Sequence, residues 1–270
     1  MHEILKDRVI IELAGNDALG FLQNLITNDI KNNVYCYSYA LNSSGRYLFD
    51  FFVFQESDTK FLIDVDINQA ELFQKHLVLY KLRAKVEVND ARQLYKIAYS
   101  KGKLQLPYVT SNQDPRYNKL GFRSIIDRNT VLSDENKDIY LEDKYLYAIT
   151  DGYDDLIYEK SIPIEYGAEE LNAVSYTKGC YIGQELISRT KYQGMVRKKI
   201  FKLSFDSTMD LNVSKNDEII AIDKKIGRIC SFYKNIAIGL VREEEVALLP
   251  ELVVTVGGHT ASLSVPPWRV

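Results

Sequence analysis

In the last quarter of the chain every apolar segment is short. This feature limits the possible folds of the chain more strongly than any other. Polar or glycine-containing turns separate six such segments after residue 196, and no helical periodicity lies between them: FKLSF, EIIAI, GRICSFY, IAIGLV, LVVTV and ASLSV. Regularly spaced short strands are typical of a small antiparallel barrel or sandwich. The sequence therefore predicts a separate all-β domain over residues 196–270, with its boundary near residue 195.

The first 195 residues have a different texture, in which single helices mix with short strands. Apolar residues recur at helical spacing over residues 18–26 and 68–80, and strongly apolar strands are expected at 46–54 and 61–65. Residues 101–118 are polar and rich in turn-forming types. Because helices and strands do not alternate regularly, the pattern indicates an α+β fold rather than a doubly wound parallel sheet.

Charge and hydropathy exclude two classes of partner. The 34 Lys+Arg nearly balance the 37 Asp+Glu, so the net charge is −3. Proteins that bind nucleic-acid phosphates need a basic surplus on one face, so nucleic acid is not an expected partner. The apolar runs fall far short of the roughly 18 residues that span a bilayer. The first residues show no apolar signal region and no transit character, so we expect a cytoplasmic protein without membrane contact.

The cysteines and histidines predict no metal site made by this chain alone. Cys36, Cys180 and Cys230 lie far apart and form no CxxC pair, and the three histidines show no HxxxH spacing. A zinc or iron–sulfur site needs three or four convergent ligands. We read Cys36 and Cys230 as packing residues, because both lie in predicted strands.

The segment SYTKGCYIGQE at residues 175–185 carries the strongest chemical signal. Glycines at 179 and 183 permit unusual backbone angles around Cys180. Lys178 and Arg189 could favour its thiolate, the form that attacks electrophiles and binds metal. Gln184 and Glu185 supply the donors and acceptors that hold a heterocycle. The alternative is that Cys180 is a small buried apolar residue.

The motif KGCYIGQE resembles, without a gap, the signature of the YgfZ-like family, tetrahydrofolate-binding proteins of iron–sulfur cluster assembly and repair that include a mitochondrial branch. Its flanks resemble that family as well, from Val174-Ser175-Tyr176 before it to Gly194 after it. Further similar segments are Arg8-Val-Ile near the start, Asp114-Pro-Arg116 in the middle and Pro266…Trp268 at the end. The resemblance thus extends along most of the chain.

That family is similar in fold to the glycine-cleavage T-protein, an aminomethyltransferase that uses tetrahydrofolate. The resemblance implies a ring of three subdomains, a C-terminal antiparallel β-barrel, and tetrahydrofolate or a one-carbon derivative in a central channel. In the T-protein a carboxylate pairs with the pterin N–H groups. Ile162-Pro-Ile-Glu165 best matches that position, so Glu165 is the candidate pterin ligand, and Glu159 is the alternative if the register slips.

Further cofactor contacts follow from the same resemblance. Tyr181, Gln184 and Glu185 lie in a segment that resembles the FxGxE-type turn of the wider superfamily, so we expect them near the cofactor. Arg116 and Arg123 could reach the glutamate tail of folate, since guanidinium groups suit carboxylates. A structural salt bridge is the alternative for both arginines.

One departure from the T-protein bears on the reaction. Where that protein has adjacent aspartates, one of them placed for the transfer chemistry, this chain has Phe49-Asp50. Proton transfer needs a polar group within hydrogen-bond reach, and Phe49 has none. We therefore expect an accessory protein for [4Fe–4S] assembly or repair in client enzymes, with Cys180 as its essential thiol and cluster-assembly proteins as partners. The alternatives are a folate-dependent aminomethyl transferase and a folate-independent thiol redox enzyme.

Overall fold

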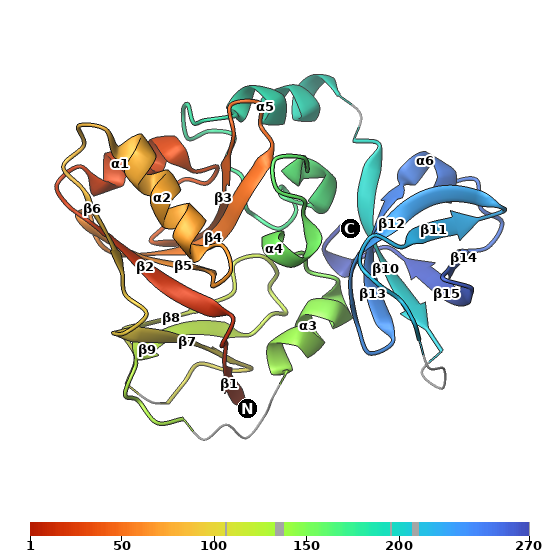
Figure 1. Ribbon diagram of the computed structural model, residues 1–270, viewed down its shortest axis with the longest axis horizontal. Helices are drawn as coiled ribbons and strands as arrows, with labels where there is room; N and C mark the ends of the chain where they lie inside the picture. The colour runs from red at the N-terminus through yellow and green to blue at the C-terminus, as the bar shows by residue number, and fades with distance from the viewer. Residues whose placement is uncertain (106, 133–137, 195, 207–210, 270) are drawn as a thin grey trace.

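The computed structural model describes residues 1–105, 107–132, 138–194, 196–206 and 211–269. Within them the chain forms two antiparallel sheets and a closed β-barrel, with short helices over and between them (Figure 1). This architecture confirms the predicted α+β class, and closure confirms a barrel rather than a sandwich. Residue 195, the predicted boundary, lies outside the described residues, and the first barrel strand begins at Lys198.

The larger sheet has five strands and is covered by two helices on one face. Its spatial order is β3-β4-β5-β2-β6, and all neighbours are antiparallel. The covering helices are α1 (Ala18–Leu25) and α2 (Ala70–Lys81) (Figure 1). The strands are β2 (Arg8–Ala14), β3 (Tyr35–Leu41), β4 (Tyr47–Ser57), β5 (Lys60–Asp66) and β6 (Glu87–Asp90).

Strand β4 is apolar along most of its length because both faces of this sheet are buried. Successive side chains of a strand point to opposite faces. Phe49 and Phe51 accordingly join the core beneath α1 and α2, whereas Phe52 and Phe54 join the core toward the rest of the molecule. Asp50 lies on this second, inner face, and its carboxylate is therefore buried at the centre of the protein.

The second sheet packs below the first and is followed by helical segments that lead to the barrel (Figure 1). Its order is β1-β7-β9-β8, with β1 (His2–Ile4), β7 (Tyr95–Ser100), β8 (Thr110–Gln113) and β9 (Phe122–Asp127). The helical segments are α3 (Ile139–Tyr147), α4 (Gly152–Asp155), the 3₁₀ turn η1 (Pro163–Tyr166) and α5 (Gln184–Gln193).

The barrel closes in the order β10-β13-β12-β11-β14-β15. Its apolar side chains alternate into a core of their own, as expected for a small barrel. Trp268 fixes the chain end to the preceding helices, since its indole N–H donates to the Tyr147 carbonyl at 2.9 Å. The elements are β10 (Lys198–Phe205), β11 (Glu218–Ala221), β12 (Lys224–Tyr233), β13 (Ile236–Arg242), α6 (Glu243–Val246), β14 (Val253–Val256), β15 (His259–Ser264) and η2 (Pro267–Arg269).

Among the described residues, no helix has the length and apolar character needed to cross a bilayer.

Candidate functional site

Cys180 is exposed, whereas the other two thiols are buried. It lies in the loop before α5, next to Gly179, whose φ of +89° is a left-handed angle that favours glycine. Nothing lies within 4 Å of the point where a Gly179 Cβ would stand, so the loop is open on this side. Burial raises the pKa of both the Cys36 and the Cys230 thiol to about 12. This arrangement excludes the buried alternative for Cys180 and leaves it as the accessible thiol of the three.

The second glycine of the motif holds the loop against the larger sheet. Gly183 has a φ of +82° and caps α5, and a Cβ on it would lie 2.6 Å from the Asn42 carbonyl oxygen. The same holds in the other direction for Gly45, in the turn between β3 and β4. A Cβ added to Gly45 would lie 2.8 Å from the Gly183 carbonyl oxygen. Two glycines therefore permit a backbone approach that fixes the start of α5, and with it the thiol loop.

The cations predicted to favour the Cys180 thiolate have other partners. The Lys178 ammonium donates to the carbonyls of Ile26 (2.6 Å) and Asn28 (2.5 Å), and burial lowers its pKa to about 8. Arg189 forms an i,i+4 ion pair with Glu185 on the exposed face of α5. Lys178 thus anchors the loop to the chain after α1, and an activating role toward Cys180 stays a prediction.

The remaining motif residues support the local turn. The Gln184 side-chain oxygen accepts the Tyr181 backbone N–H at 3.0 Å, which closes the turn before α5. Tyr181 is half-buried against the inner core, and this burial raises the pKa of its hydroxyl. Contacts of Tyr181, Gln184 or Glu185 with a cofactor stay predictions.

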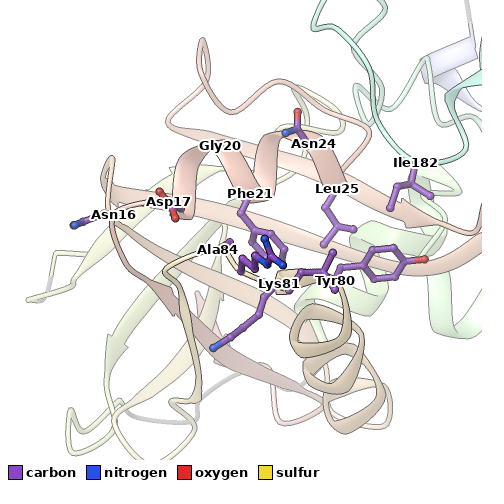
Figure 2. Close-up of a pocket in the computed structure, with 12 residues that line it drawn as sticks. Asn16, Asp17, Gly20, Phe21, Asn24, Leu25, Tyr80, Lys81, Ala84 and Ile182 are labelled. Atoms are coloured by element: carbon purple, nitrogen blue, oxygen red, sulfur yellow. The ribbon is translucent and has the colours of Figure 1, made fainter.

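A groove lined by both apolar and polar side chains reaches the thiol loop (Figure 2). Its volume is about 560 Å³, and it lies between α1 and the end of α2. Figure 2 shows Phe21 and Leu25 extending from α1 toward Tyr80 of α2, with Ile182 at one end. Ile182 belongs to the same loop as Cys180, two residues away. The groove therefore reaches the loop that carries the exposed thiol, and its apolar residues could receive an apolar side chain of another molecule.

Glu165, the predicted pterin ligand, is a half-buried carboxylate on η1. None of the described residues hydrogen-bonds its side chain, although the cations Lys198, Arg46 and Arg228 are near. Burial raises its pKa, and these cations oppose that rise. The competitor Glu159 is exposed. A partly desolvated acceptor without a hydrogen-bond partner suits the parallel N–H donors of a pterin, so the chemistry of Glu165 fits the cofactor.

Arg116 and Arg123 are fully buried in a central ionic network. Arg116 pairs with Asp114 at 2.7 Å and with Asp151 at 2.6 Å. Arg123 pairs with Asp64 at 2.9 Å and with Asp114 at 3.2 Å. These are the structural salt bridges that were the alternative for both arginines. A contact of either arginine with the folate tail stays a prediction. In the structure both guanidinium groups are paired with aspartates instead.

Sequence reasoning missed the acidic members of this network. Asp64 of strand β5 is fully buried between the apolar residues Ile63 and Val65, and it also accepts Arg8 at 2.6 Å. A carboxylate in a buried strand requires a cationic or hydrogen-bonding partner. The acid within this apolar run was therefore the sequence signal for a buried ion pair. Its partner Arg123 is 59 residues away in the chain, so no local pattern could identify it.

Phe49 and Asp50 point to opposite faces of β4. The Asp50 carboxylate accepts the hydroxyls of Tyr37 (2.9 Å) and Tyr47 (3.1 Å) on the inner face. The Phe49 ring lies in the other core, 5.3 Å from the Phe73 ring centre. Within the described residues, no three His, Cys, Asp or Glu side chains are grouped as metal ligands.

Comparisons with known proteins agree with this architecture. Residues 197–269 match the family model described as CAF17, C-terminal beta-barrel domain. A solved structure, the glycine cleavage system aminomethyltransferase T from Bartonella henselae, superposes with a TM-score of 0.73 over 99% of this chain and 85% of that one. Its sequence identity is 14%, so this likeness concerns the fold alone.

Two curated relatives are named iron-sulfur cluster assembly factors. The IBA57 homolog, mitochondrial, of Pyricularia oryzae is 33% identical over 214 residues, which cover 73% of this chain and 55% of the relative. The human factor IBA57, mitochondrial, is 28% identical over 298 residues, covering 98% of this chain and 84% of the relative. The chain thus spans about half the length of the first relative and most of the second.

These relatives contradict the predicted cytoplasmic location, because they are named as mitochondrial proteins. The prediction rested on the first residues of the chain. Targeting segments are cleaved off and are not part of the folded domain, so the sequence of the domain itself does not indicate the compartment.

The chain therefore has the glycine-cleavage T-protein fold with a CAF17-type C-terminal barrel, and it is a homologue of proteins named iron-sulfur cluster assembly factor IBA57.

Proposed function

We propose that this protein is a tetrahydrofolate-binding accessory factor for the assembly or repair of [4Fe–4S] clusters in client enzymes, with Cys180 as its working thiol. The observation that carries the proposal is the exposure of Cys180 on a glycine-flanked loop whose Ile182 lines a groove, while Cys36 and Cys230 are buried. The names of the curated relatives support the process, and the T-protein fold supports the cofactor.

Cys180 would act together with an assembly partner. One thiolate supplies a single ligand, whereas an iron–sulfur cluster needs about four. The role that suits a lone exposed thiol is therefore transient, with the other ligands supplied by the partner protein. The groove beside the loop would let an apolar side chain of that partner dock next to the sulfur.

Glu165 would hold the pterin ring. Its carboxylate would accept two parallel N–H donors, which is the pairing that planar bidentate recognition favours. Bound tetrahydrofolate would supply a reduced pterin able to carry a one-carbon unit. The chain's own contribution is to orient that ring from η1, which packs against β10 of the barrel.

Two assays separate this proposal from its alternatives. An aminomethyl transferase would move a one-carbon unit from an aminomethyl donor to tetrahydrofolate, and the placement of Phe49 in the core argues against that activity. A folate-independent thiol enzyme would not bind tetrahydrofolate. Titration of tetrahydrofolate into the purified protein and an assay of one-carbon transfer therefore distinguish the three functions.

We predict that Glu165→Ala weakens tetrahydrofolate binding by more than roughly tenfold, which is the about 1.4 kcal/mol expected for one charge-assisted contact. Glu159→Ala is the control, because that side chain is exposed. Equilibrium titration of both variants measures the effect. Equal affinities of wild type and Glu165→Ala would place the pterin ligand elsewhere.

A further inference from the structure

The groove between α1 and the end of α2 is open on its α1 side. Gly20 and Asn24 line it there and are exposed, one helical turn apart. Nothing lies within 4 Å of the point where a Gly20 Cβ would stand, although glycine is a poor helix former. Gly20 therefore leaves room above α1 for a side chain of another molecule (Figure 2).

Apolar side chains line this groove and continue around the end of α2. Phe21 of α1 extends toward Tyr80 of α2 (Figure 2). Leu82 also lines the groove and is 85% exposed, and its φ of +43° is a left-handed angle that leucine rarely adopts. Leu79, in the last turn of α2, is 70% exposed. Apolar side chains gathered on a surface in this way commonly mark a contact with another molecule.

The α2 side of the groove carries positive charge without a carboxylate partner. Lys81 and Arg83 line it, and neither forms an ion pair with an acid among the described residues. The Lys81 ammonium donates to the Val86 carbonyl oxygen at 2.8 Å. Asp17 is the acid in the lining, and its carboxylate accepts the Lys85 backbone N–H at 2.7 Å. The two cations therefore remain available to a carboxylate of another molecule.

Two kinds of surface combine apolar contact with negative charge, an acidic protein segment and an anionic membrane. The concave shape favours the first, because a groove of about 560 Å³ between two helices encloses side chains, whereas a bilayer receives protruding groups. The groove also reaches Ile182, two residues from Cys180. A segment bound in the groove therefore belongs to a molecule that lies beside the thiol loop.

We propose that the groove binds an acidic, apolar segment of the assembly protein that supplies the other cluster ligands. The apolar side chains of that segment lie against Phe21 and Tyr80, and its carboxylate pairs with Arg83. The apolar contacts supply affinity, while the charge pair sets the orientation of the segment. This inference rests on the proposed function for the identity of the partner and specifies the chemistry that recognises it.

The first test selects random peptides, displayed on phage, for binding to the purified protein. We expect the enriched peptides to combine aliphatic or aromatic residues with aspartate or glutamate. Arg83→Glu should weaken the binding of a synthetic copy at least roughly tenfold, and exchange of the acid in the peptide for lysine should restore binding to that variant. Enrichment of no peptide, or of peptides without an acid, would overturn the proposal.

The second test fills the groove without loss of the fold. Gly20→Leu places a side chain in the empty space above α1, and leucine is the better helix former, so this variant should unfold at the same or a higher urea concentration than wild type. It should nevertheless bind the selected peptide at least roughly tenfold more weakly. Gly102→Leu is the matched control, since its surroundings are equally open and it lies outside the groove lining, and it should keep wild-type binding.

The outcomes separate this inference from the role of the thiol. Cys180→Ala should still bind the peptide, so loss of its rescue in cells and loss of peptide binding by Gly20→Leu are independent results. Equal peptide binding by Gly20→Leu and wild type would overturn the docking site and leave the thiol proposal intact, and full rescue in cells by Gly20→Leu would exclude the assembly partner as its occupant. Binding of the wild type to phosphatidylcholine vesicles that contain phosphatidylserine, lost in Arg83→Glu, would assign the surface to a membrane instead.

Discussion

At the scale of single residues, the two-residue period of β4 decides which chemistry the centre can support. Asp50 is 1% exposed and is held by two tyrosine hydroxyls on the inner face. Phe49 points into the apolar core beneath α2. Because neighbouring strand residues face opposite sides, an acid at position 49 would lie in hydrocarbon rather than beside Asp50. Phe49 therefore contributes no proton-transfer group at the centre, which counts against aminomethyl transfer.

His76 gives a residue-scale prediction about pH. Its ring lies between Phe49 (5.4 Å) and Tyr80 (4.7 Å), and its Nε2 has no hydrogen-bond partner among the described residues. Burial lowers its pKa from 6.5 to about 4. The unfolded chain therefore takes up a proton first, and stability present above pH 6.5 is lost as the pH falls toward 4.

We expect His76→Phe to remove this part of the acid sensitivity. The wild-type free energy of unfolding should fall by about 1–2 kcal/mol more than that of the variant between pH 6.5 and 4, after allowance for the partial exposure of the ring. Urea denaturation at several pH values measures the difference. Parallel pH profiles for the two proteins would contradict the assignment.

At the scale of elements, the thiol loop is positioned by the contact between α5 and the β3–β4 turn. We predict that Gly183→Ala destabilises the protein by more than about 2 kcal/mol, because a positive φ and a backbone clash act together. Gly179→Ala is the matched control: it has a similar φ but an open surrounding, and should cost about 1 kcal/mol. Equal losses of unfolding free energy would mean that the close approach contributes nothing.

Elements with strong apolar periodicity could be predicted, and those without it could not. The predicted helices at 18–26 and 68–80 correspond to α1 and α2, and the strand at 46–54 to β4. Helix α5 was not predicted, because only Ile187 of its ten residues is buried. Strand β8 (TSNQ) falls in the polar stretch 101–118 and is held mainly by its pairing with β9.

At the scale of the whole molecule, buried charges join parts that are far apart in the sequence. Arg123 of β9 pairs with Asp64 of β5, which links the two sheets. Arg116 pairs with Asp151 at the start of α4, and Asp155 at its end accepts the Ser231 hydroxyl from the barrel at 2.5 Å. The network thus runs through all three parts of the fold.

We predict that Arg123→Met lowers the free energy of unfolding by about 3–5 kcal/mol, since it leaves buried carboxylate charge uncompensated. The control is Arg189→Met, which breaks an exposed ion pair with Glu185 and should cost less than about 1 kcal/mol. Urea titrations compare the two. A small loss for Arg123→Met would show that the network does not hold the sheets together.

Only the part of the candidate site that lies in one contiguous segment could be predicted from the sequence. The KGCYIGQE segment indicated an exposed cysteine between glycines, and the structure has this local geometry. The buried network of Arg116 and Arg123 arises from residues that are brought together by folding. Such groupings leave no pattern in the sequence.

The most direct test of the central claim is rescue of [4Fe–4S] enzyme activity in cells that lack this protein. Complementation with Cys180→Ala, at protein levels equal to wild type, should give no rescue, because the accessible thiol is gone while the fold is kept. Cys230→Ala is the control, since that thiol is buried and should be dispensable. Full rescue by Cys180→Ala would contradict the account.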